Sequence, residues 1–274
     1  MAPPPEPGPE PSASPGLYRL LAWISPAFPI GAFSYSHGIE AAIASGSVHD
    51  RASLERWITA VVVHGTGRMD ADILCAAHRA AAAGNRAALD AANRRGVAFR
   101  ATAELALEAA QQGDAFLATC RAAWPDAFIE AWAAPHPNPL PASGARGRSG
   151  APEAPRPAGG EREGPAAKPW EGEGQGVCHS AVFGAVAGRA GIALADALTG
   201  YLQAFAANLV SAGLRLGIIG QTDGQRILSA LEPVVARAVE TAMTRDPADF
   251  GSATFAVDVA SMMHETQYTR LFRS

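Results

Sequence analysis

Apolar residues recur every three or four positions through most of this chain, which is the spacing of one face of an α-helix. The most apolar stretch covers residues 193–219. Its large side chains fall on one helical stripe: Leu198, Tyr201, Leu202, Phe205, Leu209, Ala212 and Leu216. Polar residues interrupt the stretch at Asp196, Gln203, Asn208 and Arg215. Because charged and amide groups are costly in lipid, the pattern predicts the central buried helix of a soluble bundle and not a membrane span.

The same spacing predicts further helices on both sides of this one. They cover approximately residues 40–45, 54–63, 70–83, 86–95, 97–123, 177–190, 225–244 and 254–263. We expect Asp50 or Ser53 to cap the second of these helices, and Thr222 or Asp223 to cap the helix 225–244, because their side-chain oxygens can accept from free backbone N–H groups. No stretch alternates with period two for long enough to predict a strand. The fold is therefore expected to be all-α, a bundle of roughly eight to ten helices.

Two segments lack the helical pattern. Residues 1–16 are rich in Pro, Ser and Glu, with neither a basic segment nor an apolar run, which predicts a disordered leader and not a signal peptide. Residues 134–176 are rich in Pro, Gly and charged residues and contain little that can be buried, which predicts a disordered insertion. This insertion either divides two domains or forms a long loop within one.

The composition of the chain excludes several classes of protein. The 274 residues are 48% hydrophobic and 18% charged, which suffices for a sizeable core without disulfides. The net charge of −4 argues against a dedicated nucleic-acid-binding protein. Three widely spaced cysteines are typical of free thiols in a reducing cytosol, not of a disulfide framework or a zinc module. We therefore expect a cytoplasmic protein with neither nucleic acid nor membrane as a partner.

The 25–40 stretch concentrates polar groups at the start of a predicted helix. Pro26 and Pro29 exclude a helix from its first half, because each fixes φ and favours extended geometry in the residue before it. The candidate contact residues follow these prolines: Ser34, Tyr35, His37 and Glu40. A rigid loop that presents such groups at a helix N-terminus is usually a site or an interface. The alternative is that the loop merely fastens the first helix to the core.

Candidate catalytic chemistry is sparse. The common phosphate-binding, dinucleotide-binding and nucleophile-elbow motifs do not occur in the sequence. His37 and Glu40 are three positions apart and would share a helix face, so they offer two metal ligands or a base with its orienting group. A small helical metallohydrolase is therefore the alternative function. No second set of ligands with matching spacing is present, so we expect no catalytic residue, no metal ligand and no cofactor.

Cys178 and His179 form an adjacent pair just after the predicted insertion. Adjacent residues point to different sides of a helix. This favours a packed thiol beside an exposed imidazole over a shared site.

The tail, residues 264–274, combines aromatic and arginine side chains. Its candidate contact residues are His264, Glu265, Tyr268, Arg270, Phe272 and Arg273. Tyrosine and arginine are enriched at interface hot spots, and a terminal segment with few partners of its own is poorly ordered alone. We expect the tail to bind a partner, with packing on its own bundle as the alternative. If it becomes helical on binding, Tyr268 and Phe272 form one apolar ridge, and removal of the tail should leave folding nearly unchanged.

Three stretches, in this order, resemble the family of the urease accessory protein UreF. They are SPAFPIGAFSYSHGIE at 25–40, NLVSAGLRL at 208–216 with GQTDGQR at 220–226, and DVASMMHETQYTRLFRS at 258–274. The resemblance extends from about residue 17 to residue 274, apart from the predicted insertion. It implies one all-helical domain whose N-terminal part covers residues 17–133 and whose C-terminal part covers residues 177–274.

The resemblance also implies a function. Members of this family are dimerising scaffolds without catalytic activity that join UreD (also called UreH) and the GTPase UreG, and the assembly delivers nickel to apo-urease. In the family the tail and the N-terminal region engage UreD/UreH, and the dimer offers a surface to UreG. Four polar residues on a helix-starting turn would suit contacts with the switch region of the GTPase: Gln221, Thr222, Gln225 and Arg226.

This chain departs from the family pattern at two places. The 134–176 insertion is not part of the pattern. The Cys178–His179 pair stands where relatives usually carry an aromatic residue followed by proline. The entry to the helix that follows is therefore expected to be built differently here.

Overall fold

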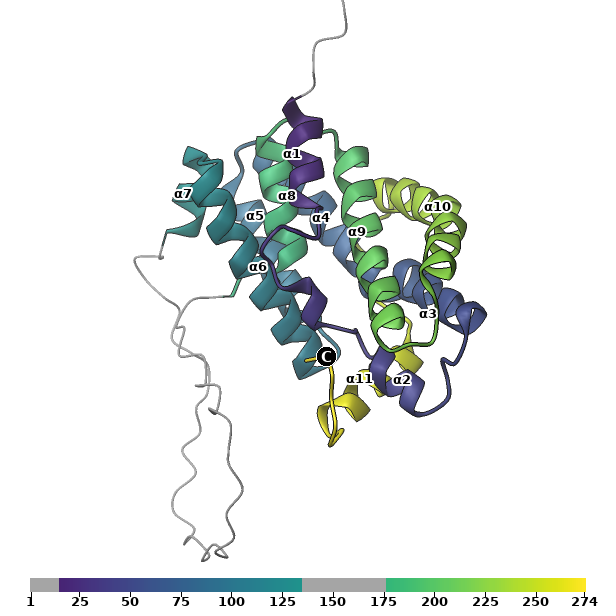
Figure 1. The fold of residues 1–274 in the computed structure, drawn as a ribbon. Helices are drawn as coiled ribbons and strands as arrows, with labels where there is room; N and C mark the ends of the chain where they lie inside the picture. The colour runs from purple at the N-terminus through teal and green to yellow at the C-terminus, as the bar shows by residue number, and fades with distance from the viewer. Residues whose placement is uncertain (1–14, 135–175) are drawn as a thin grey trace, which may run out of the picture. The chain divides into compact units, whose positions relative to one another are not determined.

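The computed structural model describes residues 15–134 and 176–274. Within these ranges the chain forms helices and their connections and no strands, so the all-α prediction is confirmed (Figure 1). Residues 135–175 of the insertion predicted at 134–176 and residues 1–14 of the predicted leader lie outside the described residues, so both stay predictions there. The last two residues of the predicted leader, Pro15 and Gly16, begin a helix, so the leader was predicted two residues too long.

The helices follow one another along the described chain as eleven α-helices and one 3-10 turn. They are α1 (Pro15–Trp23), η1 (Ala32–Ser34), α2 (Ile39–Ala44), α3 (Arg51–His64), α4 (Thr66–Ala82), α5 (Arg86–Ala98), α6 (Ala103–Ala123), α7 (Ala127–Ala133), α8 (His179–Arg189), α9 (Leu194–Arg215), α10 (Gln221–Thr244) and α11 (Phe255–Glu265).

The start of α3 is built by the residues that the sequence singled out. The Asp50 carboxylate accepts the Ser53 backbone N–H at 2.8 Å, and the Ser53 hydroxyl accepts the Asp50 backbone N–H at 3.0 Å. This reciprocal capping box satisfies two N–H groups that the helix itself leaves free. The predicted cap is confirmed.

Other helix ends differ from the prediction. The predicted helix 97–123 is divided, because the Thr102 hydroxyl accepts the Leu105 N–H and begins a new helix, α6, after α5 has ended. Helix α10 begins directly after Gly220, so Thr222 and Asp223 lie inside its first turn, and their prediction as caps was wrong. Two helices, α1 and α7, were not predicted.

Helices α4, α8 and α9 form the centre of the bundle, with α8 lying closely along α4 (Figure 1). Glycine makes this approach possible. A Cβ atom on Gly184 would lie 2.6 Å from the Leu74 carbonyl oxygen, and one on Gly188 would lie 2.6 Å from the His78 carbonyl oxygen. Helices from both sides of residues 135–175 therefore pack directly against each other.

The apolar stripe of α9 faces the core as predicted. Leu198, Leu202 and Leu209 are almost completely buried. Across the two described ranges, none of the helices has the length and apolar composition that crossing a membrane requires.

Aromatic packing fixes the beginning of the 25–40 stretch against the bundle. The Phe28 and Phe116 rings lie 5.1 Å apart between centroids, and Trp23, at the end of α1, meets the same Phe116 ring edge-on at 6.1 Å. Buried aromatic pairs of this kind add stability beyond their area. They hold the polar second half of the stretch close to α6.

Candidate functional site

The 25–40 stretch and the tail are bound to each other by their backbones. The Ser36 N–H donates to the Ser274 carbonyl oxygen at 2.7 Å, and the Arg273 N–H donates to the Ser34 carbonyl oxygen at 2.8 Å. The Ser36 hydroxyl donates to the same Ser274 oxygen. Segments more than two hundred residues apart in the sequence therefore form one structure.

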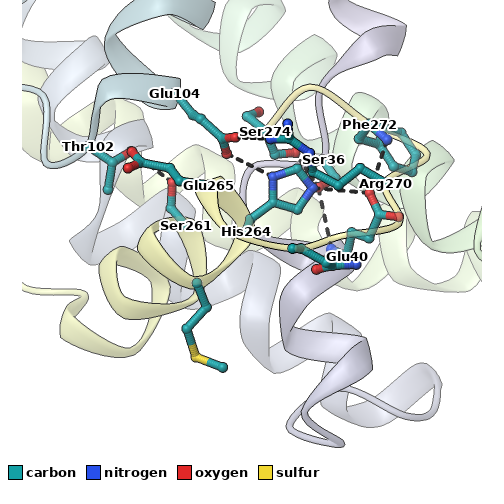
Figure 2. A network of polar contacts seen from close by, with 12 residues as sticks. Ser36, Glu40, Thr102, Glu104, Ser261, His264, Glu265, Arg270, Phe272 and Ser274 are labelled. Carbon is teal, nitrogen blue, oxygen red and sulfur yellow. Dashed lines mark hydrogen bonds and ion pairs between the residues drawn. The ribbon is translucent and has the colours of Figure 1, made fainter. Parts of the chain in front are cut away.

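Side chains from α2, α6 and α11 complete this arrangement, which we call the tail network (Figure 2). Its labelled members are Ser36, Glu40, Thr102, Glu104, Ser261, His264, Glu265, Arg270, Phe272 and Ser274. Thr102 and Ser261 share a hydrogen bond of 2.8 Å, and Glu265 accepts the Ala103 N–H at 3.0 Å. These contacts fasten α11 to the first turn of α6.

Glu40 is the main acceptor for the tail. Its carboxylate is buried and accepts the backbone N–H groups of Leu271 at 2.7 Å and Phe272 at 3.0 Å. The same carboxylate faces the His264 ring at 3.1 Å. Hydrogen bonds to an ionised acceptor are stronger than neutral ones, so Glu40 fixes the path of the tail across the bundle.

His264 occupies the centre of the network and is completely buried. Its Nδ1 atom lies 2.8 Å from a Glu104 oxygen, opposite the contact of Nε2 with Glu40. The other Glu104 oxygen accepts from the Arg270 guanidinium at 2.8 Å. Two carboxylates and two basic side chains are thus interleaved at the junction of α2, α6 and the tail.

His37 belongs to a neighbouring group. Its Nε2 atom lies 2.9 Å from the Thr66 hydroxyl and its Nδ1 atom 3.3 Å from Glu108, which also accepts from the Ser274 hydroxyl at 3.0 Å. His37 has a left-handed φ of 55°, and α2 begins only two residues later. The prediction that His37 and Glu40 share a helix face was therefore wrong, because His37 lies outside α2 and the two side chains contact different partners.

The tail does not have the shape that the sequence suggested. Helix α11 ends at Glu265, and the residues after it are not helical. Phe272 is only 4% exposed and lies 4.3 Å beneath the Arg215 guanidinium, whereas Tyr268 is fully exposed. The two aromatic residues form no common ridge in this arrangement, and the expectation of a tail with few partners of its own was wrong.

The remaining candidates of the 25–40 stretch face inward or are shared with the tail. Tyr35 is buried, and its hydroxyl donates to Gln111. Gln111 also lies 3.5 Å from the Arg273 guanidinium, and Ser34 is half-buried. Asn208 and Arg215 of α9 donate to the carbonyl oxygens of Tyr35 and Phe33. The 25–40 stretch, residues 208–216 and the tail thus meet at this place.

Comparisons with known proteins agree with the resemblance. The UreF family model matches residues 48–232. A urease accessory protein UreF from Granulibacter bethesdensis is 42% identical over 258 residues, which cover 94% of each chain. These two matches identify the family of the chain. This chain belongs to the UreF family.

Two further UreF relatives match over nearly their whole lengths. One from Rhodopseudomonas palustris strain BisB5 is 42% identical over 97% of this chain and 93% of its own. One from Azorhizobium caulinodans is 39% identical over 97% of this chain and 98% of its own. Both bear the name urease accessory protein UreF, so the resemblance seen in the sequence is confirmed.

The other candidate residues of this UreF family member lie in a different environment. Gln221, Thr222, Gln225 and Arg226 are all exposed on the first two turns of α10. Arg226 pairs with Asp223 of the same helix at 3.0 Å. The structure therefore separates the candidates into a largely buried group in and beside the tail network and an exposed group on α10.

A buried charged cluster that the sequence analysis missed lies at the centre of this UreF fold. Asp70 of α4 accepts from Arg100 at 2.7 Å, from Ser180 of α8 at 2.9 Å and from Tyr201 of α9 at 2.9 Å. Burial opposes ionisation of Asp70, but the Arg100 charge and the three hydrogen bonds hold the pKa of its carboxyl below the usual range. The sequence contained one signal of this cluster, because the Asp70 carboxylate lies on the apolar face of a predicted helix.

Cys178 is completely buried, and its sulfur lies 2.8 Å from the Arg100 guanidinium, so its prediction as a packed thiol is confirmed. His179 was expected to be exposed, and this was wrong. Its ring packs against Phe116, Phe183 and Tyr201, with centroids 5.5, 6.2 and 5.3 Å away. Burial lowers the pKa of His179 to about 4.

A cavity of about 440 Å³ lies beneath the first part of the 25–40 stretch. His37, Glu108 and Arg100 contribute to its polar wall, and Phe28 and Phe205 to its apolar wall. Most of these polar groups already bind one another. Among residues 15–134 and 176–274, no three His, Cys, Asp or Glu side chains are grouped as ligands for a metal ion.

Burial of His179 predicts a loss of stability in mild acid. Its pKa of about 4 lies below the ordinary imidazole value of about 6.5. As the pH falls from about 6.5 towards 4, the unfolded chain therefore takes up a proton at this residue before the folded chain does, and the free energy of unfolding falls. The variant His179→Phe should lose this dependence, which amounts to about 1–2 kcal/mol between pH 7 and pH 5. Urea unfolding at both pH values measures the difference. His49→Gln, which changes an exposed histidine, is the control. An unchanged acid loss in His179→Phe would contradict the assignment.

Proposed function

We propose that this chain is a non-catalytic adaptor in urease maturation. It joins a UreD/UreH-type protein and the GTPase UreG, and the assembly delivers nickel to apo-urease. The chain acts in the cytoplasm as a homodimer, carries no cofactor of its own and binds neither nucleic acid nor membrane. Family membership supports this proposal, and the tail network is the structural observation that carries it.

The outer surface around the tail network supports the assignment of the UreD/UreH-type partner. Large apolar side chains are exposed on the tail, on α11 and at η1: Phe33, Met262, Met263, Tyr268 and Leu271. Aromatic residues and methionine are enriched at protein interfaces. The buried acceptors Glu40 and Glu104 hold the tail, which carries two of these side chains, Tyr268 and Leu271.

The exposed start of α10 supports a second contact. Gln221, Thr222 and Gln225 present donors and acceptors at a helix N-terminus, and Arg226 adds a planar cation. We propose that this turn meets the switch region of UreG. The geometry does not favour the alternative metallohydrolase, because His37 lies outside α2 and the His37 and Glu40 side chains contact different partners.

The variant Tyr268→Ala tests the tail assignment. Because Tyr268 is fully exposed, its truncation should leave the melting temperature unchanged but should weaken capture of the UreD/UreH-type protein at least about thirtyfold, as loss of an interface hot spot does. Co-purification and titration of the two proteins measure this. Val97→Ala, on the exposed face of α5, is the matched control. Equal capture by wild type and Tyr268→Ala would overturn the tail assignment.

A further inference from the structure

The cavity beneath the first part of the 25–40 stretch has the size of a site for a small organic molecule. Its volume is about 440 Å³, and residues 23–33 and helices α6, α8 and α9 supply most of its wall. Pockets that hold small ligands measure about 300–1,000 Å³. An engineered apolar cavity of about 150 Å³ binds benzene, so this volume suits a molecule of about two fused rings.

Aromatic side chains form much of the apolar wall. Trp23 and Phe28 belong to the segment that covers the cavity, Phe183 belongs to α8 and Phe205 to α9. Aromatic rings attract one another in offset or edge-on arrangements beyond what their buried area provides. A flat ring also loses less rotational freedom on binding than a flexible chain does. The wall therefore favours an aromatic ligand.

The charged side chains of the wall are already bound within the protein. Among the described residues, and apart from histidines, they are Asp70, Arg100 and Glu108. Asp70 and Arg100 form an ion pair at 2.7 Å. Glu108 accepts from the Ser274 hydroxyl at 3.0 Å with one oxygen and from the Gln112 amide at 3.2 Å with the other. Because a charged ligand would lose its hydration without a free opposite charge to replace it, the wall favours an uncharged one.

His179 supplies an unsatisfied polar group on the same wall. Within residues 15–134 and 176–274 its buried Nε2 atom has no hydrogen-bond partner. Such an atom costs free energy that a partner would recover. Burial lowers the pKa of His179 to about 4, so the ring is neutral at pH 7 and Nε2 either donates or accepts. A hydroxyl group suits both cases, since it can accept and donate.

We propose that this cavity binds a small, uncharged aromatic compound that carries a hydroxyl group. The ring system packs against Phe28 and Phe205, and the hydroxyl group pairs with Nε2 of His179. The inference concerns this chain alone, so it does not rest on the proposed adaptor function.

Titration of the full chain with 2-naphthol, followed by NMR of the isoleucine methyl groups, tests the site. The Ile30 methyl groups, on the wall of the cavity, should shift in one saturable binding event. The Ile43 methyl groups belong to α2, outside the described wall, and should not shift. No shift of Ile30 up to the solubility limit of 2-naphthol, or equal shifts of Ile30 and Ile43, would overturn the proposal.

Three related compounds test the chemical class of the ligand. Naphthalene lacks the hydroxyl group and should bind about three- to tenfold more weakly than 2-naphthol, as loss of one hydrogen bond does. At pH 7, 2-naphthoate and 2-naphthylmethylammonium carry opposite charges, and each should bind at least about tenfold more weakly than 2-naphthol. Binding of any of the three as tight as that of 2-naphthol would overturn the assignment of an uncharged hydroxyl compound.

Three variants locate the binding site. Ala204→Trp places a two-ring side chain in the cavity from α9 and should weaken 2-naphthol binding at least about tenfold. The same replacement on the exposed face of α10, Ala236→Trp, is the matched control and should leave binding unchanged. His179→Phe keeps a ring but removes Nε2, so it should bind 2-naphthol no more tightly than naphthalene.

Two results from these variants would overturn the proposal. The first is wild-type affinity for 2-naphthol in Ala204→Trp, and the second is a preference for 2-naphthol over naphthalene that survives in His179→Phe. Should Ala204→Trp not fold, the Ile30 shifts of the wild type and the preference measured in His179→Phe still decide the question.

Discussion

Replacing Arg100 with methionine should lower the free energy of unfolding by about 3–5 kcal/mol, because Asp70 is then buried without its cation. The two side chains are 5% and 7% exposed, and their closest atoms are 2.7 Å apart. Asp70 also accepts from Ser180 and Tyr201, so its carboxylate connects α4, α8 and α9. Urea denaturation monitored by circular dichroism measures the loss.

An exposed ion pair provides the matched control for this variant. Arg121 and Glu130 are 2.6 Å apart, but their side chains are 43% and 39% exposed, so Arg121→Met should cost less than about 1 kcal/mol. The double variant Asp70→Leu, Arg100→Met should be more stable than Arg100→Met alone, because it leaves no buried charge unpaired. Equal losses in Arg100→Met and Arg121→Met would show that the buried pair does not anchor the core.

Helices whose determinants lie within a few residues could be predicted from the sequence. The capping box of Asp50 and Ser53 spans three positions, and the α9 stripe repeats with the helical period. The division between α5 and α6 was missed because the apolar pattern continues through it. There a single hydroxyl, that of Thr102, begins a new helix. Local periodicity therefore predicts where helices occur better than it predicts where they begin and end.

The tail network could not be predicted, because its partners are distant in the sequence. Glu40 and the Leu271 N–H are 231 positions apart, and no spacing rule relates them. The sequence correctly singled out both stretches as rich in polar chemistry, but it did not show that each satisfies the other. Tyr268 and Phe272 are both aromatic and lie in the same short polar segment, so the sequence does not distinguish them. The fold buries Phe272 and exposes Tyr268.

The buried cluster illustrates the same limit for charge. Asp70 lies among the apolar residues Met69, Ile73 and Leu74 of α4, which marks it as unusual for a helix that packs in a core. Its partners Arg100, Ser180 and Tyr201 are 30, 110 and 131 positions away. Burial of an aspartate requires such partners, but the sequence does not say which they are.

Truncation after Met263 should lower the melting temperature by about 10 °C or more, although the sequence alone suggested almost no change. The truncation removes Phe272, whose ring is buried beneath Arg215, and loss of a buried phenylalanine costs about 3–5 kcal/mol. It also leaves Glu40 and Glu104 without the tail groups that bind them. For a domain of this size, each kcal/mol lost shifts the melting temperature by about 2–4 °C. Thermal unfolding followed by circular dichroism measures the change.

Two aromatic residues of the same tail separate docking from partner binding. Phe272→Ala should reproduce most of the fall in melting temperature, because it removes the buried ring and leaves the rest of the tail in place. Tyr268→Ala should melt with the wild type, because its ring is fully exposed. A truncated protein that melts within about 2 °C of the wild type would show that the tail is not docked on the bundle in solution. The contacts of Glu40 with the tail would then form only in a complex.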